Sequence, residues 1–341
     1  MGKTLFRVLW CLLLVGFLTW LAILLWPCHP VIAWLTTRLV IAQAVAFPTL
    51  LAVAGAGVLI VALLVALRSR TSTITRYLAG LTALACAASS LLAVIDPYGS
   101  MRYQARGVLA IGCANMQIYR VTTYNALDTL TDQGLARLLA DQPDFLVLPE
   151  VSPDTPALAD GVPGYQVFAS TSQKPHIAPT LTLVSDRLGS YTAQEVPMTF
   201  GALLLTPENP ASGQPQLLAV HTAPPVPIYM QQWREDLATI DRLARDEGSL
   251  DLIAGDFNAT LLHGSLASYA GTGSLLGVDA ALATDQVEGT WPAGGVLGMK
   301  SPIDRVIVMQ GPPAGGEEVT YRRVGNSDHL AVGAALTLCS P

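Results

Sequence analysis

Six short polar segments in the second half of the chain carry the residue types that bind metal ions and move protons. They supply carboxylates, amides and imidazoles at Asn125, Glu150, His221, Asp256 with Asn258, Asp304, and Asp328 with His329. Carboxylate and amide oxygens are the ligands that Mg²⁺ and other hard divalent cations prefer. Imidazole exchanges protons near neutral pH. The set therefore predicts a divalent-metal site with acid/base groups beside it.

These polar segments adjoin apolar runs that have the length and pattern of β-strands. We expect strands at residues 117–124, 145–148, 180–184, 203–206, 216–220, 252–254, 303–309 and 330–338. Helices are expected at 135–140 and at 230–245, where Trp233, Leu237, Ile240 and Ala244 share one face. Loops at strand ends are where α/β folds collect ligand groups. The mixture of strands and helices predicts a layered α/β sandwich.

The first hundred residues have a different composition and predict a membrane anchor. Apolar stretches at 8–26, 39–67 and 77–95 contain no charged residue, and each has the roughly 20 residues needed to span a bilayer. Pro48 predicts a kink in the overlong second stretch. The first stretch could instead be a signal peptide, but its apolar run is too long and no small-residue cleavage site follows it.

Short loops between the spans predict the orientation. Lys3 and Arg7 precede the first span, and Arg68, Arg70 and Arg76 separate the second from the third. Because excess Lys and Arg mark the cytoplasmic side, we expect a multi-pass protein of the plasma membrane with its N-terminus inside. The large domain is then extracytoplasmic. No charge lies inside a span, so the spans are expected to anchor rather than transport.

Charge and cysteine content limit the kinds of site. Residues 101–341 hold 13 basic and 24 acidic residues, which disfavours a nucleic-acid partner because such proteins rely on basic surface. Five cysteines form no CxxC pair and no Cys/His cluster, so a zinc site is not expected.

We expect an anchor over 1–100, a linker over 101–114 and a catalytic domain over 115–341.

Motif order from 115 to 338 resembles the endonuclease/exonuclease/phosphatase superfamily. The motifs are LVLPE at 146–150, HTAPP at 221–225, GDFNAT at 255–260, GTWP at 289–292 and SDH at 327–329. The resemblance implies a four-layered α/β sandwich of the DNase I type, here preceded by three transmembrane helices. With its three spans, the chain is similar to the teicoplanin-resistance-associated membrane phosphatases, which act on a polyprenyl pyrophosphate. Pro149 replaces the usual Gln, and Lys174–His176 stands where many members carry Arg or Tyr.

Site roles follow from this resemblance. Asn125, Glu150 and Asp328 are expected to hold Mg²⁺ or Mn²⁺. Asp256 is expected to orient and deprotonate the attacking water, and Asn258 to hold a phosphate oxygen or that water. His221 is expected to donate a hydrogen bond to the phosphate or the leaving oxygen, and His329, oriented by Asp304, to act as the second acid/base group. Trp291 and Lys300 are expected to contact the substrate.

Each residue also has a purely structural interpretation. Asn125 and Asn258 could be turn residues, and Asp304 could cap a turn. Either His221 or His329 alone could be a hydrogen-bonded structural histidine, and Trp291 could be a core aromatic. His176 and His263 belong to no motif and are expected at the surface.

Three functions remain open on the sequence. The first is a phosphohydrolase for a lipid-linked phosphate or polyprenyl pyrophosphate at the outer leaflet. The others are an extracytoplasmic Mg²⁺-dependent nuclease and an inactive binding domain. Apolar runs at 226–230 and 293–300 could face the bilayer, with Lys300 meeting the phosphate, or could fold into the core.

A disulfide is a further expectation from the resemblance. Cys113 lies just before the first strand of the domain and Cys339 just after the last, and the family places these strands close together. An extracytoplasmic domain permits a disulfide between them. Two free thiols are the alternative.

Overall fold

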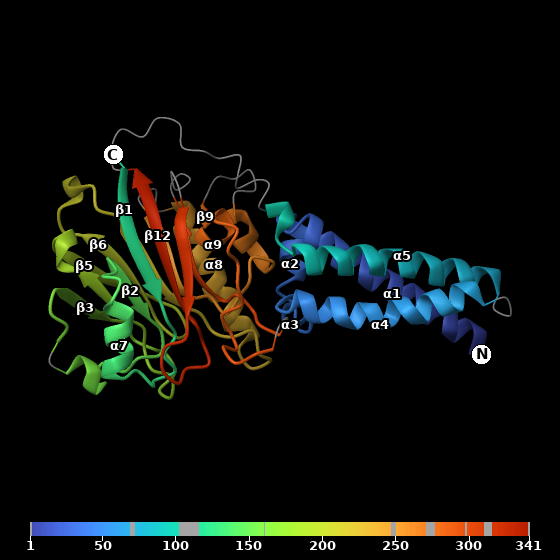
Figure 1. The fold of residues 1–341 in the computed structure, drawn as a ribbon, viewed down its shortest axis with the longest axis horizontal. Coiled ribbons are helices and arrows are strands. Elements are labelled where there is room, and N and C mark those ends of the chain that lie inside the picture. The colour runs from blue at the N-terminus through green and yellow to red at the C-terminus, as the bar shows by residue number, and fades with distance from the viewer. Residues whose placement is uncertain are drawn as a thin grey trace. The chain divides into compact units, whose positions relative to one another are not determined.

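The computed structural model describes residues 2–68, 72–101, 116–159, 161–246, 250–270, 277–296, 299–309 and 316–339. The chain forms two compact units (Figure 1). Met1–Ser100 and Leu262–Gly264 make the first unit, and the rest of the chain makes the second. Cys113 lies outside the described residues, so the expected disulfide stays a prediction.

The first unit is built on three helices that are long and apolar enough to cross a membrane: α1 (Gly2–Leu25), α4 (Pro48–Leu67) and α5 (Thr73–Ile95). Helix α5 packs against both α1 and α4. A Cβ at Gly55 would lie 2.4 Å from Oγ of Ser90, so glycine is needed where α4 approaches α5. Small residues allow this close packing of membrane helices.

The overlong second stretch is broken rather than kinked, which corrects the expectation at Pro48. Two short helices, α2 (Pro30–Leu35) and α3 (Ile41–Val45), follow α1, and α4 begins anew at Pro48. Proline is tolerated in the first turn because that turn needs no N–H donor, whereas inside a helix it clashes with the preceding turn.

His263 was expected at the surface, and this expectation is wrong. Its side chain is fully buried in the first unit. The ring nitrogen Nε2 lies 2.8 Å from the carbonyl oxygen of Ala42, so the polar ring has a hydrogen-bond partner that makes burial possible. His176 is exposed, as expected.

Two six-stranded sheets form the second unit. In the first sheet the neighbouring strands are, in order, β11 (Gly316–Arg322), β12 (Ala331–Cys339), β1 (Met116–Thr123), β2 (Phe145–Leu148), β4 (Leu181–Ser185) and β3 (Tyr165–Ala169). In the second sheet the order is β5 (Tyr191–Val196), β6 (Ala202–Pro207), β7 (Gln216–His221), β8 (Leu250–Asp256), β10 (Asp304–Val308) and β9 (Val278–Asp279). The main core lies between the sheets, where Val121, Val147, Ala219, Ala254 and Val306 are among its buried residues.

Helices cover the outer faces of the sheets and complete four layers. Helix α7 (Asp132–Leu139) packs Leu135 and Leu138 on the first sheet. Helix α8 (Met230–Asp246) buries Trp233 and Ile240, and Figure 1 shows it on the side of the second sheet. The short helix α9 spans Ala280–Ala283, and 3₁₀ turns cover Pro156–Leu158, Asp186–Leu188, Pro210–Ser212 and Gly264–Ala270. The predicted four-layered α/β sandwich is confirmed.

Strand direction brings the polar segments to one edge of the two sheets. Strands β1 and β2 are parallel, as are β7 and β8, so their carboxyl ends lie together. Strands β10 and β12 run antiparallel to β8 and β1, so their starts reach the same edge. The register pairs Asp256 with both His221 and Asp304.

Candidate active site

The carboxylate of Asp256 stands at the centre of the polar cluster. It is the last residue of β8 and is almost fully buried. Its Oδ2 accepts a hydrogen bond from Nδ2 of Asn125 at 3.0 Å, and lies 3.9 Å from Nε2 of His221 and 3.9 Å from Nε2 of His329. A Cβ at the preceding residue, Gly255, would lie 1.9 Å from the carbonyl oxygen of Val220. Only glycine lets β8 approach β7 closely enough to place Asp256 there.

Asn125 links Asp256 to Glu150 as a hydrogen-bond donor. Its Nδ2 also donates to Oε1 of Glu150 at 2.9 Å, while its Oδ1 accepts from the backbone N–H of Leu127 at 3.0 Å. The amide nitrogen therefore faces the two carboxylates, and the oxygen expected to bind a metal faces its own loop. Its role as a ligand stays a prediction.

Two residues of the cluster have left-handed backbone conformations. The φ angle is 54° at Glu150 and 45° at Asn258. Such angles are uncommon for residues other than glycine and cost free energy, so they persist where surrounding contacts hold them. For Asn258, its backbone N–H donates to Oδ1 of Asp256 at 2.8 Å, and its Nδ2 donates to the carbonyl of Thr222 at 2.9 Å.

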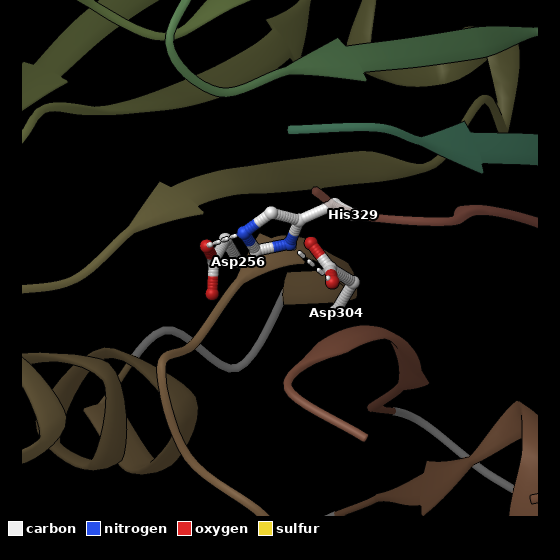
Figure 2. A group of neighbouring side chains, drawn as sticks. All are labelled: Asp256, Asp304 and His329. Carbon is white, nitrogen blue, oxygen red and sulfur yellow. Dashed lines mark hydrogen bonds and ion pairs between the residues drawn. The ribbon is translucent and has the colours of Figure 1, made fainter. Parts of the chain in front are cut away.

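His329 and Asp304 form a hydrogen-bonded pair, which Figure 2 shows with His329 between Asp304 and Asp256. Nδ1 of His329 lies 2.8 Å from Oδ2 of Asp304. Thr290 holds the start of β10, because its Oγ1 accepts the backbone N–H of Asp304 at 3.2 Å. Ser327 holds the other partner: its Oγ accepts the N–H of His329 at 3.0 Å and donates to the carbonyl of Asn125 at 2.6 Å.

His221 ends β7 and is fully enclosed. Its Nε2 lies 3.6 Å from Oε1 of Glu150. Phe200 meets its ring edge to face at 5.0 Å, and Tyr229 meets Phe200 at 5.6 Å, both measured between ring centroids. The ammonium of Lys174 lies 5.5 Å from the centroid of Tyr229. Lys174, in the segment where the family often has Arg or Tyr, thus connects to His221 through two aromatic rings.

Asp328 and Trp291 join the rim of the cluster. Nε1 of Trp291 donates to Oδ2 of Asp328 at 2.8 Å, and Oδ1 of Asp328 lies 3.8 Å from Nε2 of His329. Lys300 is partly buried, and among the described residues no hydrogen bond or ion pair joins it to the cluster. Leu297, in the same loop, lies outside the described residues. The substrate roles of Trp291 and Lys300 stay predictions.

Burial and crowding separate the protonation behaviour of these groups. Burial, together with the charge of Asp304, raises the pKa of Asp256 to about 7, and burial also raises the pKa of Glu150. Burial lowers the pKa of His221 to about 3. Burial alone would also lower the pKa of His329, but the neighbouring Asp304 outweighs it and the pKa rises to about 10. One neutral and one cationic imidazole therefore flank a crowded set of carboxylates at neutral pH.

The donor set fits a hard divalent cation. Ligand atoms of Asp256, Asp304 and His329 lie within 4.8 Å of one another, and because a protonated imidazole cannot bind a metal ion, the oxygens of Asp256 and Asp304 are the usable donors of this group. Oδ1 of Asp304 and Oδ1 of Asp328 are buried, and among the described residues neither has a hydrogen-bond partner. Buried carboxylate oxygens without partners are costly unless a cation compensates them. Oxygen-rich sites of this kind suit Mg²⁺ or Mn²⁺.

Sequence reasoning missed Asp236, which supports the site from behind. This buried side chain on α8 accepts the backbone N–H of Ala223 at 2.8 Å through Oδ2 and that of Thr199 at 3.0 Å through Oδ1. It thereby fixes the loop that follows His221. The signal in the sequence was an acidic residue three positions after Trp233, on the apolar face of α8. Thr290 and Ser327 lie within the GTWP and SDH motifs, but the motifs do not predict the hydrogen bonds that these two residues make to the backbone of the site.

The histidine charges can be tested directly in the metal-free protein. We expect ring ¹⁵N NMR to show His329 protonated at pH 8 and His221 neutral at pH 5. Because the pKa of His329 is raised in the folded protein, the protonated ring stabilises the folded state. This contribution to the free energy of unfolding is full below a pH of about 6.5, the pKa of an unperturbed histidine, and is lost as the pH rises through about 10. Asp304→Asn removes the main charge that raises this pKa, so His329 should then become neutral at lower pH.

Asp141→Asn is the matched control, because Asp141 pairs with Arg322 at 2.7 Å and lies in no site motif. It should leave both histidine spectra unchanged. A neutral His329 ring at pH 7 in the wild-type protein would contradict the pairing with Asp304.

Comparison with known proteins places this site in a family. The model of the endonuclease/exonuclease/phosphatase family matches residues 122–329, which include every residue of the cluster. No curated protein matches the chain in sequence.

Several solved structures are similar to the chain at low sequence identity. A humanized TDP2 of D. rerio is 17% identical with a TM-score of 0.51, over 64% of this chain and 98% of that one. An endonuclease/exonuclease/phosphatase from Beutenbergia cavernae is 20% identical with a TM-score of 0.48, over 65% and 72% of the two chains. An AP endonuclease from Archaeoglobus fulgidus is 14% identical with a TM-score of 0.44, over 64% and 99%. From its motifs, fold and site, the chain belongs to the endonuclease/exonuclease/phosphatase family.

Proposed function

We propose that the chain hydrolyses a lipid phosphate or polyprenyl pyrophosphate outside the membrane that its spans cross. Enzymes of the family are metal-dependent phosphodiesterases or nucleases. One observation supports a lipid substrate in particular. The same chain has the Asp256-centred cluster and three helices that are long and apolar enough to span a bilayer. A phosphohydrolase anchored in a membrane is held at the bilayer surface, where lipid substrates are concentrated.

The proposed metal ligands are Glu150, Asp328 and Asn125, with Asp256 beside them. A bound Mg²⁺ or Mn²⁺ would neutralise charge on the phosphoryl oxygens and on the leaving oxygen. Glu150 and Asp328 have carboxylates that the protein neutralises incompletely, since burial raises the pKa of Glu150 and Oδ1 of Asp328 has no hydrogen-bond partner among the described residues. Asn125 would need to turn its oxygen from the N–H of Leu127 toward the ion.

Asp256 is the proposed base that takes a proton from the attacking water. In the metal-free protein burial and the charge of Asp304 raise its pKa to about 7, and a bound cation would lower this pKa and leave the carboxylate able to accept a proton at neutral pH. The bond from the N–H of Asn258 fixes Oδ1 of Asp256, leaving Oδ2 to face the cluster. Phosphoryl transfer depends mainly on such positioning and on charge stabilisation.

The two histidines have different proposed tasks because their charges differ. His329, held protonated by Asp304, places a cation beside the developing charge on the phosphoryl group. His221, held neutral by burial, can donate a single hydrogen bond without adding charge. Its proposed partner is the phosphate or the leaving oxygen.

Surface composition supports a lipid over a nucleic acid. Lys174 and Lys300 are the only lysines after residue 100, within a segment that has 24 acidic residues. Exposed apolar side chains occur in loops between site motifs: Val226 is 40% exposed, Ile228 75%, Val296 66% and Met299 47%. Exposed apolar side chains gathered near a site favour contact with a membrane or an apolar ligand.

Metal dependence gives the first test of the enzyme. We expect EDTA to abolish phosphohydrolase activity and Mg²⁺ or Mn²⁺ to restore it. Glu150→Ala should lower kcat by about 100-fold or more, because loss of a ligand weakens the ion that neutralises the phosphate. Glu208→Ala, an exposed carboxylate after β6, is the control and should retain activity. Full activity of Glu150→Ala would remove Glu150 from the site.

Substrate choice gives a separate test. The full chain in detergent is assayed on a long-chain polyprenyl pyrophosphate, a short water-soluble analogue and single-stranded DNA. We expect hydrolysis of both pyrophosphates and little of DNA. Ile228→Ser should raise KM for the long substrate several-fold, because a serine loses apolar contact, and leave the short substrate unchanged.

Val167→Ser is the control, because Val167 on β3 is likewise an exposed apolar residue, at 40% against 75% for Ile228, but lies in no site motif. It should leave both pyrophosphates unaffected. Faster cleavage of DNA than of either pyrophosphate would contradict the proposal and identify a nuclease.

A further inference from the structure

An apolar groove runs along the first unit between α1 and α4. Both helices pack on α5, and the groove between them has a volume of about 550 Å³. Its walls are almost wholly apolar, with Phe17, Trp20 and Ile23 from α1 and Leu51, Ala54 and Val58 from α4 among the lining residues. Such a volume falls within the roughly 300–1,000 Å³ of small-molecule sites.

The groove occupies one half of the depth of the spans. On α1 it extends from Leu12 to Ile23, near the end of the helix, and on α4 from Leu51 to Val58, near the start. Residues of α2 and α3, such as Leu35 and Ile41, line it at that end. Trp26 and Trp34 at the same end are 62% and 58% exposed, and exposed tryptophans mark the membrane–water interface. The groove therefore reaches from one interface toward the middle of the bilayer.

A single cation stands at this end of the groove. Arg38 is the one charged residue between Arg7 and Arg68; in the sequence it lies between the lining residues Leu35 and Val40, although it does not itself line the groove. Its guanidinium lies 4.4 Å from the centroid of Trp34, and Nε donates to the carbonyl of Trp34 at 3.0 Å. Nη2 of Arg38 donates to Oγ1 of Thr37 at 3.2 Å, and the remaining N–H donors of the guanidinium suit it to a phosphate at the bilayer surface.

We propose that this groove binds the hydrocarbon chain of the lipid phosphate substrate, with Arg38 facing its phosphate. The inference rests on the proposed function for the class of lipid. A long apolar chain attached to an anionic group matches the two features of the site, an apolar groove and one cation at its interfacial end. By the predicted orientation this end lies in the outer leaflet, where the substrate would be.

Glycine positions allow the groove to be filled without disturbing the fold. Gly16 lines the groove, and a Cβ there meets no other atom within 4 Å, so Gly16→Leu places its side chain in open space. Ala54→Leu fills the groove from the opposite wall. Gly57→Leu is the matched control: its Cβ also meets nothing within 4 Å, but Gly57 is not among the lining residues.

The test uses the full chain in nanodiscs and a polyprenyl phosphonate with a photoreactive diazirine on its chain. We expect cross-links on α1 and α4 in the wild-type protein and in Gly57→Leu. Gly16→Leu and Ala54→Leu should each reduce labelling by about tenfold, because a leucine displaces at least two methylene groups of the bound chain. Their KM for a long-chain pyrophosphate should rise, and turnover of a short water-soluble analogue should not change. Circular dichroism at 222 nm verifies that the helices of the first unit fold in the variants, since the second unit alone could sustain the short-substrate rate.

Two outcomes would overturn the inference. One is equal labelling of the wild-type protein and both filled variants. The other is labelling that an excess of unlabelled polyprenyl phosphate in the same nanodiscs does not reduce, since the labelling would then not report a site that prefers this lipid over bulk phospholipid. Binding and hydrolysis are scored separately. A wild-type protein that is labelled in the groove but hydrolyses neither pyrophosphate would refute the proposed function and still support the chain-binding site.

Discussion

Burial of the Asp256 carboxylate beside Glu150 and Asp304 is the constraint on which the site depends. Negative charges removed from water are costly unless positive charge or hydrogen-bond donors compensate them. The protein supplies the amide of Asn125 and the imidazolium of His329, both within 4 Å of Oδ2 of Asp256. Even so the pKa of Asp256 stays near 7. This remaining deficit of positive charge is what a divalent cation would fill, and it connects the geometry to phosphoryl chemistry.

The two facing sheets meet this constraint by bringing six strand ends to one edge. Parallel pairing of β7 with β8 aligns His221 with Asp256, and antiparallel pairing of β10 aligns Asp304 with Asp256. Local strain at Glu150 and Asn258 is sustained by hydrogen bonds to neighbouring loops. The same architecture leaves the outer surface free to vary, and we propose that the three apolar helices and the apolar loops adapt it to a lipid substrate.

Much of the fold was predictable because most strands of the core are continuous apolar runs. Residues 145–148 were predicted to the residue, since β2 is buried on both faces. Strand β5 was missed because four of its six residues are exposed, so its apolar pattern is absent. Polar residues after apolar runs located the site. Which atom of Asn125 faces the carboxylates, and that Asp236 reaches Ala223 from α8, depend on tertiary contacts that no local pattern records.

Calorimetric titration of Mn²⁺ into the metal-free full chain tests the central claim most directly. At pH 6.5 in two buffers that differ in ionisation enthalpy, the account predicts one binding site and a release of protons. Protons are released because Asp256, with a pKa near 7, is partly protonated before the cation binds. The release should disappear in Asp256→Asn, and binding should weaken strongly in Glu150→Ala. A wild-type chain that binds no Mn²⁺, or that binds it equally well in Glu150→Ala, would contradict the account.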